Sequence, residues 1–468
     1  NNVTFSGFEL RNFTSAVYLS GVNNLTFQNF ALINNTYGIT LLSSSTQNNF
    51  TNGLIANSTI SDVNMSSGTD NYLTNISMSK SSISSGDDTS IIMRWYIDVY
   101  VNDTSGNNLA NATAIAYKAD GTVEDTQNTS TNGYARLTVS EFSKGMYGYT
   151  YITPHTITIS KAGYFSNSST TIAIDTTNNT ILRVNLPIIN CNTSLTTNIT
   201  LGSNLTSNGT CFTIGSNSIN IDGNGYYLIG NNSGIGINLN GNNGINITNL
   251  KLTNYTYGLS VLNSNSSVLS NIQSTNNTYG IFINQSNNNK IYDSTFANNS
   301  ASNIFVTNDG YTNNSLINVS VDINTINVTG TATVFKKWYA TVNVTFGSGY
   351  PLGNANVTGY FNTTREVDHS IISNSEGIAR LELSELKKNA SGVYYLTPHN
   401  VTVFFNSSSG YSANSTTFNI SVTNNTYINL SLSLNCTAPY NDMRITQNTV
   451  LCPGTWTIPD TGSVGVVR

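Results

Sequence analysis

Apolar and polar residues alternate along most of the chain, in short runs separated by turn residues. Ile245 and Ile247, then Leu250 and Leu252, show the pattern within a single run. Alternation with a period of two is typical of a β-strand with one buried face. The chain is therefore predicted to be all-β.

The chain also contains a sequence repeat with a period of 22 residues. The spacing recurs in three series of positions, namely Asn232, Asn254, Asn276 and Asn298; Gly236, Gly258 and Gly280; and Asn249, Asn271 and Asp293. The first part of the chain repeats it with Asn12 and Asn34, and with Ala16 and Gly38. A strand-and-turn unit of this length cannot bury its apolar face alone, so we expect coils stacked on one another.

The fixed residues of the repeat have physical roles in such a stack. Asn tolerates the left-handed backbone of a turn, and its amide can bond to the Asn above and below. Gly is expected where a side chain would collide with the neighbouring coil.

A longer repeat of about 240 residues divides the chain. Trp95-Tyr96 returns as Trp338-Tyr339, residues 151–155 (YITPH) return as 395–399 (YLTPH), and Asn190-Cys191 returns as Asn435-Cys436. Residues 93–189 and 336–434 lack the 22-residue period and show about seven alternating strands with turn signals between them, which favours a β-sandwich. The sequence thus predicts five parts, at residues 1–92, 93–189, 190–335, 336–434 and 435–468.

Two segments resemble known families. Residues 219–226 (INIDGNGY), together with the 22-residue period, resemble the right-handed parallel β-helix repeats of pectin-degrading enzymes and archaeal surface proteins, and residues 191–211 resemble their N-terminal cap. Residues 353–357 (GNANV) and 377–381 (GIARL) resemble carboxypeptidase-regulatory-like, immunoglobulin-like modules. The resemblance implies tandem right-handed parallel β-helices alternating with immunoglobulin-like β-sandwiches in a rod. The fold itself hosts enzymes, adhesins and structural proteins.

The parts are expected to join stiffly. The stretch 329–337 runs into Trp338 without a Gly/Ser- or Pro-rich tract. The Trp-Tyr pair is either a packed contact at the junction or simply the start of a core strand. Residues 1–92 lack the cap pattern, whereas residues 435–468 carry one with no β-helix after it. Two explanations fit: a piece of a longer tandem repeat, or a tail that caps the next copy head to tail in a filament.

Composition and sequence motifs exclude some classes of partner and indicate the cellular compartment. Charged residues make up 9% of the chain and the net charge is −5, so we expect neither nucleic acid nor anionic lipid as a partner. The four cysteines form two local pairs, Cys191 with Cys211 and Cys436 with Cys452, which predicts disulfides in an oxidising compartment. The sequon N-x-S/T is frequent and predicts N-linked glycans on an extracellular, cell-surface protein. Candidate sites are Asn12, Asn34, Asn57, Asn75, Asn111, Asn198, Asn246, Asn254, Asn276, Asn298, Asn356 and Asn419.

The sequence contains few candidate catalytic residues. The adjacent acids Asp87-Asp88 are interpreted as a solvated loop, while Asp222 is expected to stabilise a turn. Lys251, Lys290 and Asp293 are spread over different coils without a convergent acid cluster. We therefore predict no enzyme and no cofactor.

His155 and His399 each follow Thr-Pro, and we expect each imidazole to bond backbone at a strand entry. Asn and backbone oxygens are acceptable calcium ligands, but the few carboxylates predict at most weak binding.

The favoured function is a structural, glycosylated surface protein that forms a rigid rod, a filament or a surface layer. The alternative is an adhesin or carbohydrate-binding fibre that contacts cell-surface polysaccharide, and a polysaccharide lyase or hydrolase is least favoured. Tyr37, Tyr257 and Tyr279 occupy matching positions, and they would stack on sugars if they face outward, although inward packing is an equal alternative.

Overall fold

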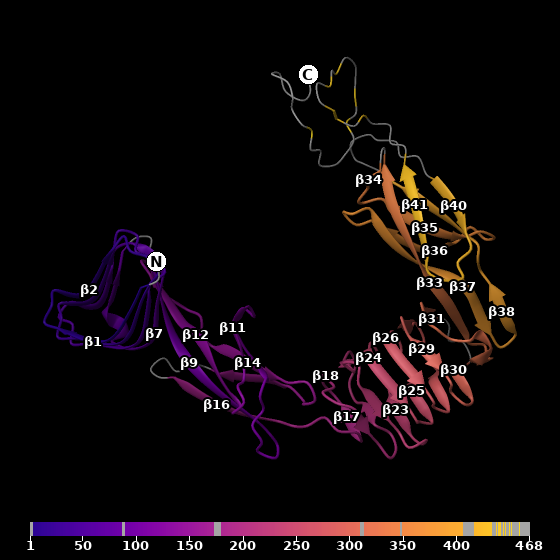
Figure 1. Ribbon diagram of the computed structural model, residues 1–468, viewed down its shortest axis with the longest axis horizontal. Helices are drawn as coiled ribbons and strands as arrows, with labels where there is room; N and C mark the ends of the chain where they lie inside the picture. The colour runs from indigo at the N-terminus through magenta and orange to yellow at the C-terminus, as the bar shows by residue number, and fades with distance from the viewer. Residues whose placement is uncertain are drawn as a thin grey trace. The chain divides into compact units, whose positions relative to one another are not determined.

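The protein is all-β and consists of two compact units, Asn1–Ile189 and Asn190–Arg468 (Figure 1). The two units are described separately. The computed structural model describes residues 3–86, 89–172, 179–308, 313–346, 349–405 and 416–432, with a few isolated residues beyond. Within these ranges the only helical segments are two 3-10 turns, η1 (Lys80–Ser82) and η2 (Ile323–Thr325). The predicted fold class is confirmed at this level.

The first unit begins as a stack of coils, each of which adds one strand to each of two parallel sheets. The longer sheet runs in the order β1 (Val3–Arg11), β3 (Leu25–Ile33), β5 (Asn49–Ala56), β7 (Gly68–Ser77) and β9 (Thr89–Asp103). The shorter sheet contains β2 (Ser15–Ser20), β4 (Tyr37–Leu42), β6 (Ser61–Met65) and β8 (Ile83–Ser85).

The second unit contains a longer stack of the same kind, which is visible in Figure 1 as the ranks of strands around β24 to β26. One sheet contains β17 (Thr193–Leu195), β20 (Phe212–Ile214), β23 (Ile235–Asn238), β25 (Tyr257–Leu262), β27 (Tyr279–Asn284), β30 (Ser302–Asn308) and β32 (Ile326–Gly330). The other contains β18 (Ile199–Thr200), β21 (Asn220–Asp222), β24 (Asn246–Thr253), β26 (Val268–Thr275), β28 (Lys290–Tyr292), β31 (Asn314–Ile317) and β33 (Thr333–Phe346). Short strands β19 (Leu205–Thr206), β22 (Tyr227–Ile229) and β29 (Thr295–Ala297) pair along its margin.

The register follows the sequence period. Asn246 pairs with Val268 and Tyr257 with Tyr279, each 22 residues on, while Val3 pairs with Leu25 in the first unit. Inward aliphatic residues therefore lie on one another, as Ile247 on Leu269 and Leu250 on Ile272, and they are buried within the stack. The predicted β-solenoid-like stacking is confirmed, while the handedness and the immunoglobulin-like classification stay predictions.

The last strand of each stack also belongs to an antiparallel layer. β9 continues beyond β7 to pair with β12 (Tyr134–Gly145), which pairs with β13 (Gly148–Tyr151), and β16 (Thr180–Leu186) pairs with β9. A second antiparallel sheet contains β11 (Val123–Asn128), β10 (Thr113–Tyr117), β14 (His155–Ser160) and β15 (Asn167–Ile172). Apolar residues of both layers join the core of the coil stack.

The second unit repeats this plan through β33. This strand pairs with β31 of the stack and with β37 (Ile378–Asn389), β34 (Tyr350–Pro351) and β41 (Thr426–Leu432), and β37 pairs with β38 (Gly392–Tyr395). The facing sheet contains β36 (Val367–Ile372), β35 (Asn356–Phe361), β39 (His399–Phe404) and β40 (Thr416–Ile420). Positions 92/93 and 335/336 thus fall inside strands, which leaves no linker at either junction.

The glycines of the 22-residue series are required by the close approach of neighbouring coils. A Cβ on Gly236 would lie 2.5 Å from the carbonyl oxygen of Gly258, and one on Gly280 would lie 2.4 Å from that of Asn303. Both distances are far inside van der Waals contact with backbone that cannot move aside. The predicted collision with the neighbouring coil is confirmed.

Candidate functional site

Columns of Asn residues follow the turns of the coils. Asn232, Asn254, Asn276 and Asn298 all have positive φ, between 57° and 67°. The backbone N–H of Asn232 donates to the backbone carbonyl of Asn254, and the backbone N–H of Asn254 donates to the backbone carbonyl of Asn276. The predicted left-handed turn and alignment are confirmed, but this column is joined through the backbone.

The side-chain ladder lies one residue further along the chain. Asn277 is 3% exposed, and its Oδ1 accepts from the backbone N–H of Tyr255 at 2.9 Å. Its own N–H donates to Asn299 Oδ1, and the N–H of Asn299 donates to Asn303 Oδ1. The side chains of Asn277 and Asn299 each satisfy a backbone donor of the coil before, and Asn303 satisfies one four residues earlier in the chain. A buried N–H without a partner would be costly.

The first unit and a second turn of the second unit contain equivalent ladders. Asn48 and Asn71 are fully buried, and Asn71 Oδ1 accepts from both the N–H and the Nδ2 of Asn48. Asn289 and Asn314 repeat this arrangement at 3.1 Å and 3.0 Å. Sequence reasoning missed these residues, although consecutive Asn pairs such as Asn276-Asn277 carry the signal.

An outer Asn column also bonds between coils. Asn271 Nδ2 donates to Asn249 Oδ1 at 2.8 Å, and Asn75 Nδ2 donates to Asn52 Oδ1 at 2.8 Å. Asn75 is a glycosylation candidate whose amide is thus engaged in this column.

The other candidates with described side chains are exposed or half-buried, as a glycan acceptor must be. They are Asn12, Asn34, Asn57, Asn111, Asn198, Asn246, Asn254, Asn276, Asn298 and Asn356. The side chain of Asn419 lies outside the described residues.

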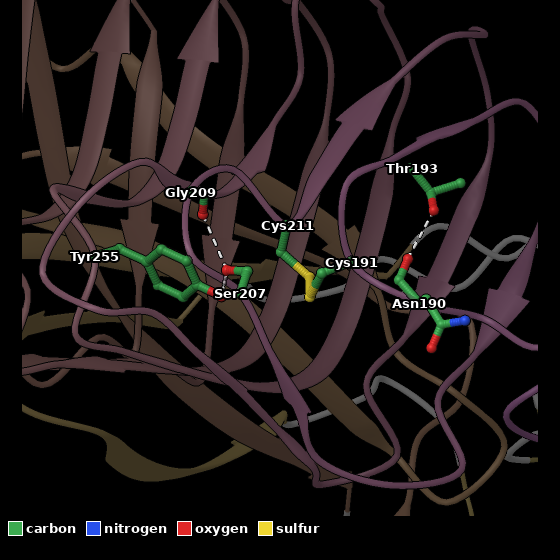
Figure 2. Close-up of a disulfide and its surroundings, with 7 residues drawn as sticks. All are labelled: Asn190, Cys191, Thr193, Ser207, Gly209, Cys211 and Tyr255. Carbon is green, nitrogen blue, oxygen red and sulfur yellow. Dashed lines mark hydrogen bonds between the residues drawn. A yellow bond between two sulfur atoms is a disulfide. The ribbon is translucent and has the colours of Figure 1, made fainter.

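A disulfide between Cys191 and Cys211 joins the first two coils of the second unit (Figure 2). The cysteines precede β17 and β20, which pair with each other, and the N–H of Thr193 donates to the carbonyl of Cys211. Ser207 of the same coils is contacted by Tyr255 from a later coil, between β24 and β25. The fully buried Tyr255 hydroxyl lies 3.0 Å from Ser207 Oγ, and burial raises the pKa of Tyr255. Cys436 and Cys452 lie outside the described residues.

A buried carboxylate joins the coil stack to the antiparallel layer in the first unit. Glu141 of β12, with a side chain 1% exposed, accepts from the Trp95 indole N–H at 2.7 Å and from Lys80 Nζ at 2.8 Å. Lys80 lies in η1, and its ammonium is 5.7 Å from the centre of the Trp95 ring. Trp95 is itself 4% exposed in the middle of β9, so it is both a core residue and a junction contact.

The second unit builds the same junction from a different cation. Glu385 Oε2 accepts from the Trp338 indole at 2.7 Å and from Lys336 Nζ at 2.6 Å, and Lys336 lies on β33 itself. Sequence reasoning found the tryptophans and missed the two acids. Their signal is a Ser-Glu pair that recurs at the same place in two strands, Ser140-Glu141 and Ser384-Glu385, 244 residues apart.

The predicted backbone partner of the two histidines is wrong. His155 and His399 are fully buried at the first positions of β14 and β39, but each Nε2 bonds a carboxylate, Glu124 at 2.5 Å and Asp368 at 3.0 Å. A carboxylate is favoured because it also reaches the opposite layer, where Asp368 accepts from the N–H of Ser384.

The carboxylate of Asp368 is held ionised. Burial alone would raise the pKa of Asp368, but the His399 hydrogen bond and the Lys337 charge 3.0 Å away lower it to about 2. Burial opposes ionisation of Glu124 too, and the His155 and Ser140 hydrogen bonds lower its pKa. Both groups act as bridges between layers.

The acids and lysines weighed for catalysis have separate structural partners. Asp222 accepts from the N–H of Asn224 and from Asn249 Nδ2, in a turn as predicted. Lys251 lies over the Tyr227 ring, and Asp293 accepts from Asn318.

Lys290 pairs with Glu382 at 3.5 Å. Asp87 and Asp88 lie outside the described residues. Over the described part of the chain, no cluster of three or more His, Cys, Asp or Glu side chains could hold a metal ion.

An aromatic column follows one outer sheet face of the second unit. The rings of Tyr257 and Tyr279 stack 5.1 Å apart, and Phe282 and Phe305 join them at 5.2 Å and 5.6 Å. Phe282 alternates with the buried Ile281 and therefore points outward. The four rings are half-buried, since each covers the next. Tyr37 has the matching place in β4.

No protein-family model and no curated protein sequence matches the chain. Among solved structures it is similar to the Bacillus anthracis TIE protein, with 10% identity and a TM-score of 0.16, over 74% of this chain and 36% of that protein. It is also similar to the shaft pilin SpaA from Lactobacillus rhamnosus GG, with 8% identity and a TM-score of 0.16, over 74% and 100% of the two chains. The chain thus spans about a third of the first protein, and both likenesses are too remote to bear on fold or function. In the described residues, no helix has the length and apolarity to cross a membrane.

Proposed function

We propose that the chain is a structural protein of the cell exterior, built as a stiff, glycosylated element of a rod, filament or surface layer. The observation that carries the proposal is the strand shared by each coil stack and its antiparallel layer. β9 and β33 run through both parts, so each unit bends only by breaking strand pairing or the buried Glu141 and Glu385 junctions. Scaffolding requires such stiffness.

The surrounding chemistry supports the same setting. A disulfide favours an oxidising compartment, and the sequons with exposed Asn side chains favour glycosylation there. The antiparallel layers are proposed to be immunoglobulin-like spacers in an architecture of archaeal surface type. The proposal assigns the chain no catalytic or cofactor role and leaves weak calcium binding at the turns as an expectation.

Electron microscopy of the native assembly tests the function directly. We expect regular fibres or a lattice, with glycopeptides at several of the predicted sites by mass spectrometry. Isolated particles in native material, or cytoplasmic chains without glycans, would contradict the proposal.

Association of copies head to tail is a separate part of the proposal and is supported by the recurrence of Asn190-Cys191 as Asn435-Cys436. Deleting residues 435–468 should abolish fibres while leaving the fold of residues 190–432 intact by circular dichroism. Fibres of unchanged repeat from the truncated chain would refute association through the tail.

A further inference from the structure

The first unit contains a cleft of about 420 Å³ where the outer face of its long sheet meets β11. Its floor is formed by neighbouring residues on β5, β7, β9 and β12, with Thr74 paired to Arg94 and Tyr96 paired to Thr138. Glu124 and Asp125 of β11 close one side. The volume lies in the range of small-molecule sites.

Every one of the eight side chains that line the cleft carries a hydrogen-bonding group, and none is aliphatic. The Arg94 guanidinium lies 3.6 Å from the centre of the Tyr72 ring, and it has no ion-pair partner among the described residues. The Arg94 guanidinium, which carries only donors, therefore shares the cleft with Glu124 and Asp125. Both carboxylates also accept hydrogen bonds from the protein, Glu124 from His155 and Asp125 from the N–H of Thr138. Tyr96 adds a ring surface, and Arg136 lies 4.4 Å from its centre.

We propose that this cleft binds a neutral sugar residue of a glycan. A sugar ring presents hydroxyl groups that both donate and accept, which matches carboxylates and a guanidinium in one site, and its C–H face packs on an aromatic ring. Two carboxylates against one cation disfavour an anionic sugar. A lining without aliphatic groups disfavours an apolar peptide side chain.

The second unit provides a matched comparison within the same chain. Its equivalent cleft has about 370 Å³ and is lined by Lys337, Lys290 and Asp368. There Lys337 pairs with Asp368 at 3.0 Å and Lys290 with Glu382 at 3.5 Å, so both cations of this cleft, unlike Arg94, have an ionic partner. We expect this cleft to bind sugar weakly or not at all.

The sugar could come from two sources. Asn49 and Thr51 line the first cleft and form a sequon, Asn49-Phe50-Thr51, so a glycan on Asn49 would begin inside it. Attachment would join Asn49 Nδ2 to the anomeric carbon of a sugar on a lipid phosphate; the phosphate leaves and the amide loses one proton. The other source is a separate glycan.

Saturation-transfer NMR on the full chain, produced without N-glycosylation, tests the site. The probes are methyl α-mannoside, methyl β-galactoside, N-acetylglucosamine and galacturonate. At least one neutral sugar should bind, and Arg94→Met should weaken its binding at least tenfold, while Lys337→Met in the second unit changes nothing. Asp125→Asn gives a second variant should Arg94→Met fail to fold.

Three results would overturn the inference: no binding of any neutral sugar, unchanged affinity in the folded cleft variants, or equal binding of galacturonate. None of them touches the structural function, which is tested by imaging.

Protein from a glycosylating host then separates the sources. If the glycan on Asn49 fills the cleft, the free sugar no longer binds and Asn49→Gln restores binding. Unchanged binding of the free sugar assigns the cleft to a separate glycan.

Discussion

At the scale of single residues, two adjacent Asn positions perform different tasks in the stack. Asn276 adopts the left-handed turn with its side chain exposed, whereas Asn277 is buried and accepts from the backbone of the coil before it. The positive φ favours Asn or Gly, and the buried N–H requires an acceptor. Asn therefore serves two separate purposes in the stack: it adopts the left-handed turn at one position and supplies a hydrogen-bond acceptor at the next.

Replacement of Asn277 by Ala should destabilise the second unit by about 1–3 kcal/mol, because the buried N–H of Tyr255 loses its acceptor. Urea unfolding followed by circular dichroism measures the change. Asn276→Gly is the matched control, since it keeps the left-handed turn and should be nearly neutral. Equal effects of the two variants would show that the ladder contributes nothing.

Asp368 makes the stability of the second unit depend on pH. Its pKa is lowered from 3.8 to about 2 on folding, which corresponds to about 2 kcal/mol. A lowered folded-state pKa means that this stability is fully present above about pH 4 and is lost as the pH falls toward 2.

Asp368→Asn should remove this dependence between about pH 4 and pH 2, in thermal melts of the full chain. The exposed Glu366→Gln is the charge-matched control and should change stability by less than about 0.5 kcal/mol. An unchanged acid profile in Asp368→Asn would show that other carboxylates determine it.

The sequence predicted the residue columns because residues that stack on one another recur at a constant spacing of 22 positions. It did not reveal the carboxylate partners of His155 and His399, because Glu124 and Asp368 lie 31 residues away on another strand. Which side chains meet across a two-layer core depends on the pairing of strands, and alternation alone does not specify that pairing.

At the scale of elements, the junction between coil stack and antiparallel layer is a continuous strand with a buried Trp–Glu–Lys cluster beneath it. The absence of a linker in the sequence predicted a stiff junction. The cluster was not predictable, because its cation comes from η1 in one unit and from β33 in the other. The fold preserves the charge pair without preserving the position of the lysine.

Glu141→Ala should cost about 1–3 kcal/mol, because it leaves the buried indole N–H of Trp95 without its acceptor and removes one ionic partner of Lys80. Differential scanning calorimetry should show the first unit melting at lower temperature. Glu9→Ala removes an acid from an exposed ion pair with Arg11 and should cost less than about 1 kcal/mol. A loss for Glu141→Ala no greater than that of Glu9→Ala would contradict a role for the cluster at the junction.

At the scale of the whole molecule, one plan is used twice, and the copies differ in local detail. The second unit begins with coils cross-linked by the Cys191–Cys211 disulfide, and its stack is longer. A cross-link that closes 20 residues is worth about 3 kcal/mol in the chain-entropy account.

Replacing Cys191 and Cys211 together by Ser should lower the stability of the second unit by about that amount and leave the first unit unchanged. Calorimetry with and without reductant measures both. Reductant should have little further effect on the second unit of the double variant. A shift confined to the first unit would contradict the prediction.

The shared strands also set how each unit comes apart. The coil stack and the antiparallel layer both pair with β9 in the first unit and with β33 in the second, so loss of the shared strand removes support from both. Partial opening is thereby discouraged, and each unit should lose its structure in a single cooperative step. The arrangement should protect each unit against proteolysis, because a half-open intermediate with cleavable loose ends is rarely populated.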